Sequence, residues 1–289
     1  MKDANPPKNT LIGPGERLYL DIMKNCLTRA IFAERYAALR RPAVVGKRAM
    51  LWWAIYPYLN RILHSQNLEL VRQVHIDPAQ HIEGGHWPPE AETMLGLKRL
   101  DNIEYCIRRV IEERIPGDLI ETGVWRGGGC IYMKAVLRAA GDTSRVVWMA
   151  DSFEGLPRPN PKFAADNGDK HWTYSHYLAV SLDEVKANIG RYGLLDDKVR
   201  FLKGWFEDTL PQAPIERLAV LRLDGDMYGS TITALKSLYP KLSVGGYCIV
   251  DDYGLRPCQR AVDDFRAAHG IEEAMRQIDH TAVYWKRTR

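Results

Sequence analysis

From about residue 100 onward, short apolar runs of β-forming residues alternate with segments that have the apolar spacing of amphipathic helices. The apolar runs lie in "GDLIETG", "RVVWMADSF", "VRFLKGW", "LAVLRLDGD" and "GGYCIVDDY". Two further short strands are expected near 275–279 and 281–286. The helical patterns are "DNIEYCIRRVIEER", "GGCIYMKAVLRAA", "SLDEVKANIGRYG", "TITALKSLYPKL" and "QRAVDDFRAAHG". Because strands joined by crossover helices form a parallel, doubly wound sheet, we predict an α/β fold with a mostly parallel sheet of seven strands.

Residues 1–90 differ from the rest of the chain. They contain a helical pattern in "RLYLDIMKNCLTRAIFAERYAALR" and an aromatic stretch, "AMLWWAIYPYL", but no alternation typical of strands. We therefore expect helices and a mobile connection here. The aromatic stretch contains a proline and is about half of the ~20 residues that a membrane span needs. Core or subunit packing is the expected role of its aromatic side chains.

Composition excludes several classes of protein. A formal charge of +4 on 289 residues, with Lys and Arg spread along the chain, gives no support for nucleic-acid binding. Five cysteines without C-x-x-C spacing argue against structural disulfides and a thiolate zinc site. The N-terminal sequence "MKDANPPKNT" lacks an apolar signal-peptide core. We expect a cytoplasmic protein without a membrane segment.

Ligands of such sheets bind beyond the carboxyl ends of the strands. The first strand ends in "LIETGVWRGGG", where glycines allow a tight turn and a close approach to a ligand. This loop is not G-x-G-x-x-G, which argues against a dinucleotide. Asp151, 28 residues after Gly123, ends the second strand where nucleotide-binding folds place an acid on the ribose. A solvated acid or a helix cap is the alternative for Asp151.

Three acids follow the fourth and fifth predicted strands. Asp224 follows "LRL", and Asp251 and Asp252 follow "YCIV". These strands are expected to be neighbours, so the acids should converge, although side-chain alternation suggests that one of the adjacent pair points away. Like charges repel when buried, and three oxygen ligands suit a hard divalent cation, most naturally Mg²⁺. Exposed acids near helix starts are the alternative, which applies best to Asp226.

A family resemblance rests on five ordered motifs. "LIETGVWRGGG", "ADSFEGLP", "FLKGWFEDTLP", "LRLDGDMYGST" and "GGYCIVDDYG" resemble the macrocin O-methyltransferase family (TylF/MycF-like), from about residue 90 to the end. A fainter similarity lies at "LYLDIMKNCLTRAIF". The family uses S-adenosylmethionine and Mg²⁺ to methylate hydroxyls of antibiotic sugars and related products. The resemblance implies a class I methyltransferase domain at 91–289 and an N-terminal helical lid region at 1–90. The stretch at 40–66 looks longer than in the family, which leaves the acceptor open.

The resemblance also implies roles for individual residues. Asp224, Asp251 and Asp252 match the metal ligands, and Asp151 matches the acid on the ribose hydroxyls. We hypothesise that Asp224 is also the catalytic base. The residues that match donor contacts are Thr93, Met94, Glu121, Thr122, Gly123, Val124, Trp125, Asp151, Ser152, Phe153, Gly204 and Trp205.

Mg²⁺ coordination would lower the pKa of a sugar hydroxyl and orient it, and two vicinal acceptor oxygens would complete the octahedron. His171, in a polar insertion after Gly155, is a competing base, although a loop histidine is more often a surface residue. Its neighbours Trp172, Tyr174 and His176 are candidate acceptor contacts.

The prediction is therefore methylation of a sugar hydroxyl on a glycosylated natural product, with a phenolic or catechol-like acceptor as the alternative. A nicotinamide dehydrogenase leaves the acids unexplained, and a non-enzymatic scaffold would not need them. The expected partners are a small-molecule acceptor and further copies of the chain, as a homodimer or a larger homo-oligomer, but no nucleic acid or membrane.

Overall fold

The computed structural model of the chain describes residues 13–32, 36–39, 47–73, 77–168 and 170–289. A seven-stranded sheet forms the centre, in the order β5-β4-β3-β6-β7-β9-β8. The first five strands in this order pair in parallel, and β9 pairs antiparallel with both β7 and β8. The strands are β3 (Asp118–Thr122), β4 (Val147–Asp151), β5 (Val199–Lys203), β6 (Leu218–Leu223), β7 (Leu242–Val250), β8 (Arg276–Gln277) and β9 (Val283–Lys286). The predicted mostly parallel sheet of seven strands is confirmed.

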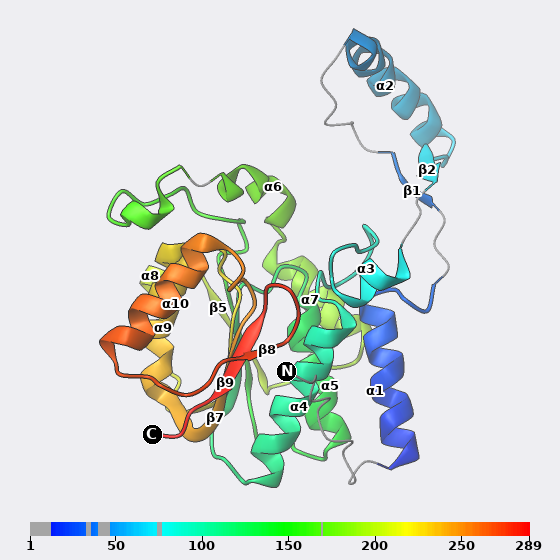
Figure 1. The fold of residues 1–289 in the computed structure, drawn as a ribbon. Coiled ribbons are helices and arrows are strands. Elements are labelled where there is room, and N and C mark those ends of the chain that lie inside the picture. Colours follow the sequence, from blue (N-terminus) through cyan, green and yellow to red (C-terminus); the bar gives the residue numbers. More distant parts are fainter. Residues whose placement is uncertain (1–12, 33–35, 40–46, 74–76, 169) are drawn as a thin grey trace.

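Helices cover both faces of the sheet (Figure 1). One face carries α1 (Pro14–Leu27), α4 (Leu97–Glu112), α5 (Gly128–Ala139) and α7 (Leu182–Arg191). The other face carries α8 (Phe206–Thr209), α9 (Tyr228–Leu238) and α10 (Arg256–Ala268). Shorter elements connect them: α3 (Pro78–Ile82), η1 (Ala164–Asp166), η2 (His171–Tyr174), α6 (Ser175–Leu178) and η3 (Tyr239–Lys241).

Strand side chains alternate between two buried cores. Leu119 of β3 and Met149 of β4 belong to the core beneath α4 and α5, whereas Ile120 and Trp148 belong to the core beneath α9 and α10. Burial on both faces explains why these strands read as continuous apolar runs. It also fixes the register of the strands. The carboxyl ends of the parallel strands β3–β7 therefore meet at one edge of the sheet.

The N-terminal region differs from the prediction in two respects. The helical pattern that starts at residue 17 continues only to Leu27, because Arg29 takes a left-handed conformation (φ 59°). Two strands, β1 (Tyr36–Ala38) and β2 (Val71–Gln73), pair antiparallel where we expected none. Strands of three residues are too short to show alternation, and each depends on a partner that is distant in the sequence. The expected connection at 75–90 is interrupted by α3, and its residues 75 and 76 lie outside the described residues.

The elements β1, α2 (Lys47–Ser65) and β2 lie away from the seven-stranded sheet and its helices (Figure 1). Tyr58 on α2 is 74% exposed, so core packing within one chain is excluded for this side chain. Among the described residues, no helix combines the length and apolarity that a membrane crossing requires.

Candidate active site

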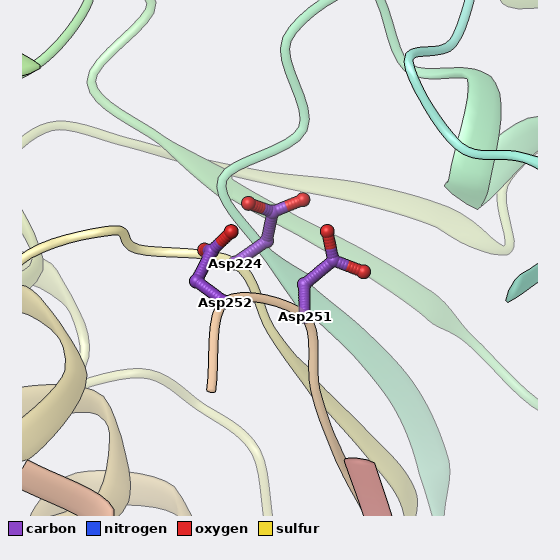
Figure 2. Close-up of side chains that lie close together, drawn as sticks. All are labelled: Asp224, Asp251 and Asp252. Atoms are coloured by element: carbon purple, nitrogen blue, oxygen red, sulfur yellow. The ribbon is translucent and has the colours of Figure 1, made fainter. Parts of the chain in front are cut away.

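Three carboxylates meet at the carboxyl edge of the sheet, where β6 and β7 lie side by side. Ligand oxygens of Asp224, Asp251 and Asp252 lie within 4.8 Å of one another (Figure 2). The predicted convergence of these acids is confirmed. The expectation that one of the adjacent pair points away is wrong, because β7 ends at Val250 and both acids lie beyond the alternation of the strand.

The guanidinium groups of Arg222 and Arg99 neutralise part of the negative charge of these carboxylates. The sequence analysis did not identify either group. Nη1 of Arg222 donates to Glu121 Oε1 at 2.5 Å and to Asp224 Oδ2 at 3.0 Å, and its Nη2 donates to Asp251. Asp251 also accepts a hydrogen bond from Arg99. The signal for Arg222 was available, because a charged residue inside the buried run "LAVLRL" must have an opposite charge beside it.

Burial changes the protonation equilibria of the cluster. It raises the pKa of Asp224, and the Asp251 carboxylate adds to this effect. It also raises the pKa of Asp252, together with the charges of Asp226 and Asp224. Burial alone would lower the pKa of Arg222, but the Asp251 and Glu121 carboxylates outweigh this effect and keep it charged. The cluster holds an excess of negative charge that a divalent cation would offset, and its oxygen ligands suit Mg²⁺.

The loops after β3 and β6 touch one another beside these acids. Gly123 has a φ of +84°, and a Cβ on it would lie 1.9 Å from the carbonyl oxygen of Asp224. The Asp224 N–H donates to the Thr122 carbonyl at 2.9 Å. A side chain at position 123 would therefore displace a predicted metal ligand, which explains the glycine.

Asp151 binds the glycine-rich loop through backbone groups. Its Oδ2 accepts hydrogen bonds from Val124 N (2.8 Å) and Trp125 N (3.3 Å), and its Oδ1 accepts one from Phe153 N (2.7 Å). Burial raises the pKa of Asp151, although these hydrogen bonds oppose the effect. Trp125 and Phe153 both have positive φ, of 46° and 59°. Strained backbone of this kind is typical of ligand sites, and Asp151 holds both strained loops.

A cavity of about 790 Å³ opens in front of these groups, a size typical of small-molecule sites (~300–1,000 Å³). It includes all three clustered acids. The predicted donor residues that line it are Thr93, Met94, Glu121, Gly123, Val124, Trp125, Asp151, Ser152 and Trp205.

Three predicted donor residues do not line the cavity. Thr122 and Phe153 are buried, and the N–H of Gly204 donates to the Asp151 carbonyl at 2.9 Å. In the polar insertion, His171 and Tyr174 line the cavity, whereas Trp172 and His176 do not.

Comparison with known proteins decides the family. A family model described as Macrocin-O-methyltransferase (TylF) matches residues 16–287. The chain belongs to this family. The match begins within α1, so the faint N-terminal resemblance is confirmed as well. This member of the macrocin O-methyltransferase family is an O-methyltransferase, as are its named relatives.

Two relatives and one solved structure illustrate the similarity. The 8-demethyl-8-(2,3-dimethoxy-alpha-L-rhamnosyl)-tetracenomycin-C 4'-O-methyltransferase of Streptomyces olivaceus is 54% identical over 213 residues, which cover 73% of this chain and 82% of the relative. The mycinamicin III 3''-O-methyltransferase of Micromonospora griseorubida is 47% identical over 208 residues, which cover 71% and 82%. The O-methyltransferase NovP is 43% identical and superposes with a TM-score of 0.79, covering 95% of this chain and 100% of NovP.

Proposed function

We propose that this enzyme transfers a methyl group from S-adenosylmethionine to a hydroxyl of a sugar on a glycosylated natural product, and that it requires Mg²⁺. The observation that carries the proposal is the convergence of Asp224, Asp251 and Asp252 at one end of the cavity. The relatives act on a rhamnosyl tetracenomycin and on mycinamicin III, which supports a glycoside as the acceptor.

The methyl donor would occupy the part of the cavity beside the glycine-rich loop. Asp151 would accept hydrogen bonds from the ribose hydroxyls, since a carboxylate oxygen can accept more than the backbone hydrogen bonds that it already has. Glu121 faces the cavity at the end of β3, and burial raises its pKa to about 7 despite the nearby Arg222. Trp205 lies two residues after β5, where it would contact the adenine.

The acceptor would lie between the carboxylates and the polar insertion. A Mg²⁺ ion held by the three acids would lower the pKa of the acceptor hydroxyl and orient it toward the methyl group. Asp224, whose side chain is 29% exposed, would accept the hydroxyl proton. Because Mg²⁺ prefers six oxygen ligands and the acids would supply three, an acceptor with two vicinal oxygens would fill two of the other three positions.

Two further expectations belong to this proposal. The domain at 91–289 would perform the chemistry, and the region at 1–90 would cover the acceptor side and support assembly into a homodimer or larger homo-oligomer. The exposed side chains of Ile55, Tyr58 and Ile62 on α2 support an interface between copies. The cytoplasmic location expected from the sequence stays a prediction.

The test is a methyl-transfer assay with labelled S-adenosylmethionine and Mg²⁺ over a panel of acceptors. The panel contains mycinamicin III, the rhamnosyl tetracenomycin and a simple catechol, and products are identified by mass spectrometry. The proposal predicts methylation of a glycoside on its sugar. Methylation of the catechol alone would favour the phenolic alternative, and no transfer to any acceptor would contradict the proposed acceptor class.

A further inference from the structure

The loop at residues 156–178, of which all but residue 169 are described, forms one wall of the cavity. It connects β4 to α7 and contributes Arg158, Phe163, His171 and Tyr177, among others, to the lining. Its two ends are held together, because the hydroxyl of Ser175 donates to the Leu156 carbonyl at 3.2 Å. The position of the remainder of this wall depends on what holds the middle of the loop.

We propose that Asp166 is a positioning residue that fastens this loop to the start of α9 and so sets the acceptor side of the cavity. Its side chain is almost fully buried. Its Oδ1 accepts a hydrogen bond from Tyr228 N at 2.7 Å, and its Oδ2 accepts one from Gly229 N at 2.9 Å. The N-cap residue of α9, Met227, offers no side-chain cap. Asp166 therefore supplies, from a distant loop, the negative group that a helix N-terminus favours.

Apolar packing supports the same attachment. The ring of Phe163 lies 5.7 Å from the ring of Tyr228, centroid to centroid. A Cβ at position 229 would lie 2.7 Å from the Phe163 ring, so the glycine allows the loop to approach the helix closely. The η1 turn, which ends at Asp166, packs against both α9 and α10.

The attachment point is close in sequence to the predicted cation site. Asp224 and Tyr228 are separated only by the turn at 225–227, in which Asp226 has a φ of +53° and donates its N–H to Asp252 Oδ2 at 3.1 Å. Asp166 thus fixes the loop relative to the segment that carries the carboxylates. The donor-side loops are held by Asp151 instead, which accepts hydrogen bonds from Val124 N at 2.8 Å and Phe153 N at 2.7 Å.

Loss of this attachment should therefore weaken acceptor binding and leave donor binding unchanged. When a wall of a site is in place for only a fraction of the time, the apparent dissociation constant rises by the reciprocal of that fraction. Asp166→Ala should raise the KM for the acceptor about fivefold, which corresponds to the roughly 1 kcal/mol that a side-chain cap contributes. The kcat and the Kd for S-adenosylhomocysteine should each change less than about twofold. This effect on the acceptor rests on the proposed function.

The experiment compares Asp166→Ala, Asp166→Asn and Asp142→Ala, with the panel acceptor that the wild type methylates fastest. Asp142 is a matched control because its Oδ1 also accepts two backbone N–H groups, from Ser144 (2.9 Å) and Arg145 (3.3 Å), in a turn before β4. Asp166→Asn keeps one acceptor oxygen and should give an intermediate KM. Limited trypsin digestion provides a second measurement, with faster cleavage after Lys162 and Lys170 expected in Asp166→Ala.

An unchanged acceptor KM together with unchanged cleavage in Asp166→Ala would overturn the proposal. So would an equal rise of the KM in Asp142→Ala. If the wild type methylates no acceptor, the proposed function fails, and the cleavage rates alone then decide whether Asp166 fastens the loop.

Discussion

At the scale of single residues, Arg222 explains how several acids can lie close together at the carboxyl edge of the sheet. Its side chain is 1% exposed and is bonded to carboxylates from three segments of the chain. The sequence alone predicted the acids, because each follows an apolar strand. It did not predict which charges pair, since the pairing of Arg222 with Glu121 depends on the register of β3 against β6.

Replacement of Arg222 should be costly for the fold. Arg222→Met leaves Glu121 and Asp251 buried with less compensating charge, so we expect the free energy of unfolding to fall by about 3–5 kcal/mol in urea denaturation. Arg260→Met is the control, because the Arg260 side chain is 65% exposed and its Nε lies 3.7 Å from Asp264 Oδ2 on the surface. It should change the free energy by less than about 0.5 kcal/mol. Equal effects of the two variants would contradict the role of Arg222.

Replacement of Asp224 should be costly for catalysis. Asp224→Ala removes both a predicted cation ligand and the proposed base, so turnover should fall by at least about a thousandfold. Calorimetry with S-adenosylhomocysteine should give a Kd within about twofold of wild type, since Asp151 holds the donor side. Asp197→Asn, an exposed acid before β5, should leave both quantities unchanged. Wild-type turnover in Asp224→Ala would refute the assignment.

At the scale of elements, the strands and crossover helices followed from their periodicity, whereas the docking of α1 did not. The helical spacing of Leu18, Ile22 and Leu27 indicates one apolar face. Only Leu27 of these is buried, together with Leu20 and Met23, whereas Leu18 and Ile22 are exposed. The reason is a buried polar contact: Lys24 Nζ donates to Glu104 Oε2 of α4 at 3.1 Å. Apolar spacing alone cannot show that a lysine lies on the buried face.

This contact predicts a dependence of stability on pH. Burial would raise the pKa of Glu104, but Lys24 and the Tyr132 hydroxyl outweigh it and lower the pKa. The stabilisation is therefore complete above the unfolded pKa of about 4.3 and is lost as the pH falls through the lower folded pKa. Glu104→Gln should reduce the free energy of unfolding by about 3 kcal/mol at pH 7 and by clearly less at pH 3.

A matched control lies on the same helix. Glu112 of α4 pairs with Arg109 at 3.0 Å on the exposed surface. Glu112→Gln should cost less than about 0.5 kcal/mol at pH 7. A loss in Glu104→Gln no larger than this, measured by urea denaturation, would show that the buried contact does not fasten α1.

At the scale of the whole molecule, the sequence predicted the ligand edge of the sheet but not the full wall of the cavity. Strand ends are local features, so the positions of Asp151 and Asp224 could be inferred from short motifs. The loop at 156–178 reaches α9 through Asp166, and no pattern in either segment indicates that contact. The contact forms only in the folded chain, where the carboxylate and the N–H groups that it binds come together.

The proposed reaction depends above all on a cation bound by the three carboxylates. Transfer of labelled methyl from S-adenosylmethionine to the preferred glycoside should therefore be measured in EDTA, and again after Mg²⁺ is added in excess. We predict that transfer stops in EDTA and returns with Mg²⁺, and that Asp252→Ala is not restored by the same addition. Transfer at an undiminished rate in EDTA would contradict the claim.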